Sequence, residues 1–376
     1  MSKINIPIAK PIIEDEEIEE VVKVLKSGFI AQGFKVAEFE KEFAEFIKAK
    51  YGIATSSGTA ALHTALLSCG IGEGDEVLTS PFSFVATGNS ILYTGAKPVF
   101  IDINKDTYTL DHDKLETAIN NKTKAIMPVQ LYGQSGDMDE IMKIAKKNNL
   151  TVIEDASQAH GAIYKKNGSD FDGKKIGSIG DLGCFSFYPS KNMTTGEGGM
   201  ITTNNEEYAN KAKMIRSHGE SGRYKHAILG YNFRMTDISA AIGLVQLKKL
   251  DNFNQQRIKN AKFLNKELAN LKGIKTPKTI GDSVHVYHQY TISIENGSRD
   301  EWIKFLNENG VGTGIHYTTP IYKQELYENL GFKDKCPVSE YVANKVVSIP
   351  IHPKITMDDL KIIVDVLKRA SNKFIG

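Results

Sequence analysis

The pattern of apolar and polar residues predicts a layered α/β fold over residues 52–203. Short apolar runs alternate there with longer segments whose apolar residues recur every three or four positions. The short runs have the length of buried strands, and the longer segments have the period of helices. Such alternation is typical of a mainly parallel sheet with helices on both faces. The predicted strands are 52–57, 76–81, 97–103, 124–133, 150–157, 182–188 and 198–203, and the helices among them are 59–70, 83–95, 112–120 and 138–149.

Helical patterns also flank this alternating region. Apolar residues at helical spacing predict two surface-packed helices at 15–28 and 35–52, and a long helix at 235–271 that joins two domains. The polar, glycine-rich stretch between two of the predicted strands, 161–181, is expected to form a hairpin. We predict a large domain at 1–250, whose residues 1–30 can pack on the other domain, and a smaller α+β domain at 251–376.

Composition and charge exclude several classes of function. The 376 residues include 47 basic and 45 acidic side chains, and the net charge of +2 is too small to attract nucleic acid or a membrane surface by itself. Anionic ligands must therefore be bound by local groups. Cys69, Cys184 and Cys336 lie far apart without metal-ligand spacing, so we expect no metal site and no disulfide framework, and a reducing, cytoplasmic location. No apolar stretch approaches the length of a membrane span.

The first candidate ligand site lies where a predicted strand runs directly into a helix. Ligands of parallel α/β sheets bind beyond the carboxyl ends of strands. The sequence SSGTAAL, residues 56–62, occupies such a place, and the first N–H groups of its helix and nearby hydroxyls can cradle a phosphate. The simpler alternative is that Ser57 or Thr59 caps the helix.

A second candidate is VIEDASQAHG, which places Glu154, Asp155, Gln158 and His160 directly after a strand. We expect one of these side chains to face the ligand crevice. A buried carboxylate can accept a hydrogen bond from a cationic ring nitrogen and keep it protonated, as an electron-sink cofactor requires. The alternative is an aspartate that caps a helix.

The third candidate is Lys191, in SFYPSKNMTTGEGG just after an apolar run. Partial burial lowers the pKa of a lysine amine, so Lys191 can supply the neutral amine that forms a Schiff base. Ser186, Thr194 and Thr195 can bind phosphate oxygens or the backbone. The alternative is a lysine in a solvated loop.

Aromatic and basic residues elsewhere add further candidates. Phe82 and Phe84 follow a strand, where one ring can stack on a planar ligand while the other packs in the core. Asn232 and Arg234 stand in an apolar-aromatic setting from which they can reach their own site or a neighbour's. The last two candidates are His316 and His352, although a histidine more often stabilises structure than binds a ligand.

Taken together and in this order, the motifs SSGTAAL, EDASQAHGA, SFYPSKNMTTGEGG and GYNFRM resemble those of the DegT-type nucleotide-sugar aminotransferases. These are fold type I enzymes that depend on pyridoxal 5'-phosphate. The resemblance extends over nearly the whole chain, from residue 7 to residue 353. It implies a large α/β domain with a mainly parallel, mixed sheet flanked by helices, and a smaller C-terminal α+β domain.

The resemblance also implies roles for individual residues. Lys191 would hold the cofactor aldehyde covalently and move a proton between substrate and cofactor carbons. Asp155 would pair with the pyridinium nitrogen, Gln158 would contact the ring hydroxyl, and Phe84 would stack on the ring. The other implied residues are Ser57, Gly58, Thr59 and Ser186 at the phosphate, Asn232 at the phosphate of the other subunit's cofactor, and His316, Tyr317 and Arg234 at the substrate.

The reaction that the resemblance implies is the transfer of an amino group from L-glutamate to a nucleotide-linked 4-keto-6-deoxy sugar, for surface glycan synthesis. A homodimer with shared active sites would carry it out. The TTGEGG that follows Lys191 resembles enzymes that aminate sugar C4 more than those that act at C3. The alternatives are a C3-ketosugar, a keto-inositol, or a non-catalytic regulator on the same fold. The co-occurrence of Lys191, Asp155 and a phosphate cradle argues against the regulator.

Overall fold

The computed structural model describes residues 6–375, and a sheet of seven strands lies at its centre. The strand order is β1-β7-β6-β5-β4-β2-β3; β7 runs antiparallel to both neighbours, and the other neighbouring strands are parallel. The predicted mainly parallel, mixed sheet is therefore confirmed. The strands are β1 (Tyr51–Thr55), β2 (Glu76–Thr79), β3 (Lys97–Phe100), β4 (Thr123–Met127), β5 (Thr151–Asp155), β6 (Leu182–Ser186) and β7 (Gly199–Thr203).

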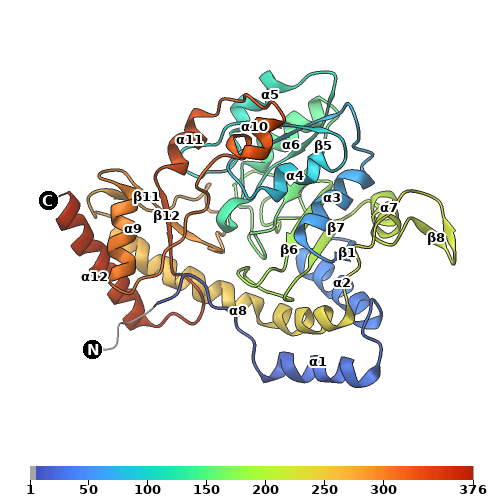
Figure 1. Cartoon of the computed structure of the whole chain (residues 1–376), viewed down its shortest axis with the longest axis horizontal. Helices are drawn as coiled ribbons and strands as arrows, with labels where there is room; N and C mark the ends of the chain where they lie inside the picture. The colour runs from blue at the N-terminus through green and yellow to red at the C-terminus, as the bar shows by residue number, and fades with distance from the viewer. Residues whose placement is uncertain (1–5, 376) are drawn as a thin grey trace.

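Helices cover both faces of this sheet because its strands are apolar on both sides (Figure 1). Consecutive strand residues pack in opposite cores, as Ile53 and Ala54 do in β1. One core is completed by α2, α6 and the first half of α8, and the other by α3, α4 and α7. The helices are α1 (Asp15–Ser27), α2 (Phe34–Ile47), α3 (Gly58–Ser68), α4 (Ala86–Leu92), α5 (Leu115–Ala118), α6 (Met138–Lys147), α7 (Glu206–Arg216) and α8 (Asp237–Leu268).

A further core surrounds a three-stranded antiparallel sheet with the order β10-β11-β12. Helix α8 joins the cores, because Leu244 and Leu250 pack under the large sheet whereas Leu264 and Leu268 pack at the small one. Figure 1 shows α8 running along the lower side of the molecule between them. The elements of this region are β10 (Ile274–Lys275), β11 (Tyr290–Ile294), α9 (Arg299–Glu308), β12 (Val346–Ile349) and α12 (Met357–Phe374).

The segment between α9 and β12 returns to the large sheet. It carries α10 (Glu325–Asn329) and α11 (Pro337–Ala343). The Tyr327 hydroxyl donates a hydrogen bond to Asn89 on α4 (2.9 Å), and the Ser339 N–H donates to Asp102 beyond β3 (2.9 Å). At the other end of the chain, Ile6 forms a parallel bridge with Val311. The two predicted domains thus contact each other in both directions, and the boundary at residue 250 stays a prediction.

The glycine-rich segment 161–181 contains a short, irregular form of the predicted hairpin. An antiparallel bridge joins Ile163 and Lys175, and the N–H groups of Tyr164 and Ile176 donate across it to the carbonyls of Lys174 and Ala162 (2.9 Å each). Buried Glu154 fixes the end of the segment, by accepting hydrogen bonds from the backbone N–H groups of Gly177 (3.1 Å), Ile179 (2.9 Å) and Gly180 (2.9 Å). A two-stranded hairpin occurs later in the chain, at β8 (Glu220–Gly222) and β9 (Lys225–His226), and it projects away from the sheet (Figure 1).

The longest described helix, α8, has 32 residues and carries charged side chains at Asp237 and from Lys248 onward. Within residues 6–375, no helix combines the length and the apolar character needed to cross a membrane.

Candidate active site

A pocket of about 520 Å³ opens beyond the carboxyl ends of β5 and β6, and residues 288–289 and 316–317 close its other side. This is the edge at which parallel α/β sheets bind ligands. The pocket brings together side chains from distant parts of the sequence. The predicted site residues that line it are Ser57, Gly58, Thr59, Phe84, Asp155, Gln158, Ser186, Lys191, His316 and Tyr317.

The N-terminus of α3 presents free backbone donors to this pocket. The Ser57 hydroxyl accepts a hydrogen bond from the Ala60 N–H (3.1 Å), which confirms the capping alternative for Ser57. Among residues 6–375, no acceptor is found for the N–H groups of Gly58 and Thr59. A Cβ at Gly58 would lie 2.5 Å from the Ser186 Cβ, so glycine is required for the helix to approach β6. Two free N–H groups at a helix N-terminus beside a hydroxyl form an anion site.

Asp155 is the last residue of β5, and its buried carboxylate is fixed by two hydrogen bonds. Oδ2 accepts from the Thr87 hydroxyl on α4 (2.7 Å), and Oδ1 accepts from the Ser157 N–H (3.3 Å). Thr87 is itself placed by Ser83, whose hydroxyl lies 2.7 Å away. Because a carboxylate can accept more than two hydrogen bonds, Asp155 retains capacity for a donor in the pocket.

Lys191 lines the same pocket and is half-buried. Burial lowers the pKa of its amine to about 8, while the charge of Asp155 acts in the opposite direction. About a tenth of such amines are neutral at pH 7. The neighbouring hydroxyls serve the backbone, since Thr194 donates to the Phe187 carbonyl (2.8 Å) and Thr195 donates to the Glu197 carbonyl (2.7 Å).

Gln158 and the aromatic residues form one wall of the pocket. The Gln158 side chain accepts from the Tyr132 N–H (2.8 Å) and donates to the Tyr317 hydroxyl (3.1 Å). Burial and the charge of Asp155 raise the pKa of Tyr317, which therefore stays neutral. Phe84 is 57% exposed on the pocket wall, whereas Phe82 is buried in the core. Phe84 is thus the ring that is available for stacking.

The two histidines of the pocket are neutral at pH 7. His316 Nδ1 lies 2.9 Å from the Ser348 hydroxyl, and burial, followed by the positive charge of Lys191, lowers the pKa of His316 to about 4. Burial and the charge of Lys191 also lower the pKa of His288. The other described residues of the wall include no arginine and no second lysine. Lys191 is therefore the only cationic side chain that the described part of this chain places in the pocket.

Several candidate residues lie outside the pocket, and besides Phe82, Thr194, Thr195 and His352 they include four more. Asn232 is exposed and Arg234 is half-buried, on the segment that follows the β8–β9 hairpin, and neither lines the pocket of its own chain. Glu154 anchors the glycine-rich loop. His160 is buried between the rings of Phe185 and Phe187, with centroids 5.4 and 5.6 Å away.

Several lining residues are not predicted from the sequence. Thr87 holds Asp155 by a hydrogen bond, but it lies within a predicted helix, and nothing in the helical pattern indicates that its hydroxyl faces a ligand site. His288 and Gln289 precede the strand β11, and the aromatic pattern around them indicates only a buried strand. The other lining residues of this kind are Ser83, Tyr188, Ser190 and Glu197.

Comparison with known proteins decides the family. A model of the DegT/DnrJ/EryC1/StrS aminotransferase family matches residues 11–368. The chain belongs to this family. The resemblance drawn from the motifs is therefore confirmed, and the protein is a pyridoxal-phosphate-dependent aminotransferase.

Named relatives and solved structures cover nearly the whole aminotransferase. It is 39% identical to the spore coat polysaccharide biosynthesis protein SpsC of Bacillus subtilis (96% of each chain) and 38% identical to the GDP-perosamine synthase of Caulobacter vibrioides (96% and 97%). It is 39% identical to the UDP-2-acetamido-2-deoxy-3-oxo-D-glucuronate aminotransferase of Pseudomonas aeruginosa (93% and 95%). The PLP form of Spr1654 from Streptococcus pneumoniae superimposes with a TM-score of 0.92 at 30% identity (99% and 100%).

The pocket of the aminotransferase fits pyridoxal phosphate. The free N–H groups of Gly58 and Thr59 suit a phosphate, and the missing Cβ of Gly58 lets the Ser186 hydroxyl approach the same place. Lys191 supplies an amine of lowered pKa for the aldehyde, and Asp155 supplies a fixed carboxylate for the ring nitrogen. The chemistry of this set of groups matches the parts of the cofactor.

Proposed function

We propose that this aminotransferase transfers an amino group from L-glutamate to a nucleotide-linked 4-keto-6-deoxy sugar, giving an amino sugar for surface glycans. The observation that carries the proposal is a single pocket that holds the Lys191 amine, the Asp155 carboxylate and the free N–H groups of α3. The names of GDP-perosamine synthase and SpsC support the nucleotide-sugar acceptor and the glycan pathway.

The binding residues act by position and charge. When bound, pyridoxal phosphate supplies an aldehyde that links amines covalently and a protonated ring that takes up the electron pair left on carbon by deprotonation. Asp155 keeps the proton on the ring nitrogen, because its carboxylate is held by Thr87 and cannot turn away. Gly58 and Ser186 bind the phosphate, together with the N–H of Thr59 and the Ser57 hydroxyl. Phe84 covers one face of the ring, and Gln158 contacts the ring hydroxyl.

Lys191 moves the proton. The Lys191 Nζ would hold the cofactor aldehyde, and once the amino donor has taken its place this amine would be free to act as a base. Burial increases the neutral fraction of this amine about 300-fold at pH 7 over that of a lysine with a pKa of 10.5. Lys191 takes the α-proton of L-glutamate in the first half-reaction. In the second half it removes and returns protons as the amine passes to the sugar carbonyl carbon, while the nucleotide contributes only binding energy.

The proposed working unit is a homodimer in which Asn232 and Arg234 reach the pocket of the partner subunit. The described chain exposes large apolar side chains that an interface can cover, namely Phe29 (69% exposed), Phe34 (80%) and Leu229 (82%). His316 and Tyr317, which line the pocket of their own chain, are proposed to face the sugar.

Subunit mixing tests the shared pocket. Lys191→Ala and Asn232→Ala are each expected to lose most activity. When the two variants are unfolded together and reassembled in equal amounts, half of the dimers are mixed and carry one intact pocket, so about a quarter of the wild-type activity should return. A mixture no more active than its components would contradict the sharing of Asn232.

We also propose a cytoplasmic location for the enzyme. Cys69, Cys184 and Cys336 form no disulfide in the described chain. Thiols stay free in a reducing compartment, which supports the proposal.

A 3-keto sugar is the second candidate acceptor. It is favoured by the relative from Pseudomonas aeruginosa, whose name specifies a 3-oxo sugar and whose identity to this chain is as high as that of SpsC. The C4 proposal rests on the TTGEGG sequence after Lys191. A keto-inositol is a third acceptor that the same chemistry would serve.

A substrate panel distinguishes these acceptors. The purified enzyme with L-glutamate is given 4-keto and 3-keto sugars on UDP, GDP and dTDP, as well as a keto-inositol, and the aminated carbon of each product is assigned by NMR. The proposal predicts a 4-amino sugar and little turnover of the other acceptors. Turnover confined to 3-keto sugars would replace C4 by C3, and no turnover of any acceptor with L-glutamate would contradict the proposed reaction.

A further inference from the structure

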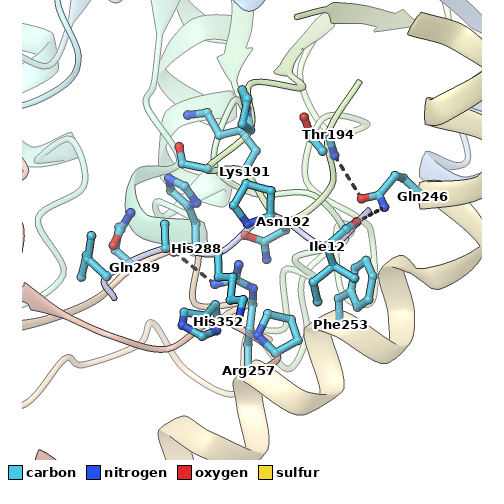
Figure 2. A pocket seen from close by; sticks show the side chains of 17 residues that line it. Ile12, Lys191, Asn192, Thr194, Gln246, Phe253, Arg257, His288, Gln289 and His352 are labelled. Atoms are coloured by element: carbon cyan, nitrogen blue, oxygen red, sulfur yellow. Dashed lines mark hydrogen bonds between the residues drawn. The ribbon is translucent and has the colours of Figure 1, made fainter. Parts of the chain in front are cut away.

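A second, smaller cavity borders Lys191 on the side of α8 (Figure 2). It lies among the N-terminal segment 8–12, α8 and residues 352–353, and it shares Ser190, Lys191, His288 and Gln289 with the larger pocket. Its volume of about 20 Å³ exceeds the roughly 10–15 Å³ that one water molecule needs, and it suits a single-atom occupant slightly larger than water. A carboxylate or a phosphate is too large for it.

Arg257 of α8 is the buried charge of this cavity. Its side chain is 6% exposed, and Nη1 donates to the carbonyl oxygens of Tyr287 (3.1 Å) and His288 (3.4 Å). The Nε atom has no acceptor, and no carboxylate within residues 6–375 forms an ion pair with the guanidinium. Burial lowers the pKa of Arg257 to about 10, so the group stays charged at pH 7. A buried charge without a counterion is costly.

The groups around Arg257 do not neutralise it. His288 is 6% exposed and its Nδ1 has no partner among the described residues. His352 is 4% exposed, and burial, followed by the charge of Arg257, lowers its pKa to about 4, so it is neutral at pH 7. The buried carboxylate of Glu17 on α1 is already bonded to Lys249, at 3.0 Å. Figure 2 shows His352 beside Arg257, whereas the His288 ring lies nearer Lys191 and His288 meets Arg257 through its backbone carbonyl.

We propose that this cavity binds one monatomic anion, chloride under ordinary conditions, between Arg257, His288 and His352. The volume sets the size of the occupant, and the unpaired guanidinium sets its charge. The unpartnered Nε–H of Arg257 provides a donor, and the unpartnered Nδ1 of His288 provides a second in the tautomer that carries its proton there. Because Lys191 lines the same cavity, the anion also favours the ammonium form of Lys191 over the neutral amine. This inference does not depend on the identity of the sugar acceptor.

The test uses holoenzyme, because bound pyridoxal phosphate keeps the phosphate cradle of α3 filled. Crystals grown with sodium bromide are measured at the bromine absorption edge. We expect an anomalous peak within hydrogen-bonding distance of Arg257. In solution, chloride should raise the unfolding temperature relative to methanesulfonate at equal ionic strength, saturably and by on the order of 2 °C at ten times its dissociation constant.

Variants separate the cavity from other halide sites. Arg257→Gln should lose both the peak and the chloride-specific shift, whereas Arg369→Gln, on the surface of α12, should keep both. If Arg257→Gln does not fold, the wild-type bromide peak and the comparison of chloride with methanesulfonate decide alone. Density for water only overturns the proposal, and so does a bromide peak without a saturable chloride shift, which would mean an adventitious ion only.

Discussion

Replacing Lys191 by methionine should stabilise the cofactor-free protein at neutral pH, although it abolishes the reaction. The folded protein holds the pKa of Lys191 at about 8, against an ordinary value of 10.5. Between these two values the unfolded chain binds more protons, so wild-type stability rises with pH across that window. Below pH 8 the amine is charged in both states, and the folded state carries the full cost of burying it.

The magnitude follows from the two values. The interval from about 8 to 10.5 corresponds to about 3 kcal/mol if the amine is fully shielded. Lys191 is half-buried on a pocket wall that water can enter, so screening reduces the cost to between about 1 and 3 kcal/mol. For a chain of this length, the unfolding temperature would then rise by about 1–4 °C. Methionine has a similar length and no charge, so it leaves the packing largely intact.

The assay compares thermal unfolding of cofactor-free wild type, Lys191→Met and Lys41→Met at pH 7 and pH 10. The advantage of Lys191→Met should fall at pH 10 to about a quarter of its value at pH 7. Lys41 is the matched control, because its side chain is 77% exposed on α2 and its removal should shift neither curve. The reasoning is refuted if Lys191→Met is less stable than wild type at pH 7, or if its advantage is equal at both pH values.

Three further substitutions test the rest of the site. Thr87→Val removes the 2.7 Å hydrogen bond to the carboxylate of the site, so kcat/KM should fall about 10- to 100-fold, and an unchanged kcat/KM would contradict its positioning role. Gly58→Ala places a Cβ 2.5 Å from the Ser186 Cβ and should weaken pyridoxal phosphate binding, measured by equilibrium dialysis, at least about tenfold. Gly72→Ala is the control and should not weaken binding, because the nearest atom to its Cβ, the Thr94 carbonyl oxygen, is 4.0 Å away. Phe84→Ala should weaken cofactor binding and leave urea unfolding unchanged, whereas Phe82→Ala should lower the free energy of unfolding by about 3 kcal/mol. Equal effects of the two substitutions would contradict the assignment of Phe84 to the pocket and Phe82 to the core.

The sequence predicts Asp155 and Lys191 as site residues for a physical reason. Each stands where an apolar run ends, and the ends of buried strands are where a parallel sheet exposes side chains to a ligand. Thr87 cannot be found in this way, because its relation to Asp155, 68 residues away, depends on how α4 packs on the sheet. Local pattern describes the period of a helix and says nothing of its rotation against a strand.

The same limit explains which features of the fold the sequence pattern does not predict. The glycines of 161–181 indicate turns, but a single glutamate, Glu154, organises the loop through backbone N–H groups that carry no sequence signal. The return of α10 and α11 to the large sheet depends on Asp102 and Tyr327, which meet their partners only in the folded chain. Likewise, the sequence around Arg257 indicates only an ordinary helical arginine, because its burial without a carboxylate partner arises only in the folded chain.

The most direct test of the central claim is to reduce the pyridoxal phosphate holoenzyme with borohydride, before and after L-glutamate, and to locate the bound cofactor by peptide mass spectrometry. The account predicts that the pyridoxyl group is found on Lys191 before glutamate and is largely lost from the protein after it, because the donor amine has displaced the lysine. Label on another lysine, or label on Lys191 that L-glutamate does not diminish, would contradict the account.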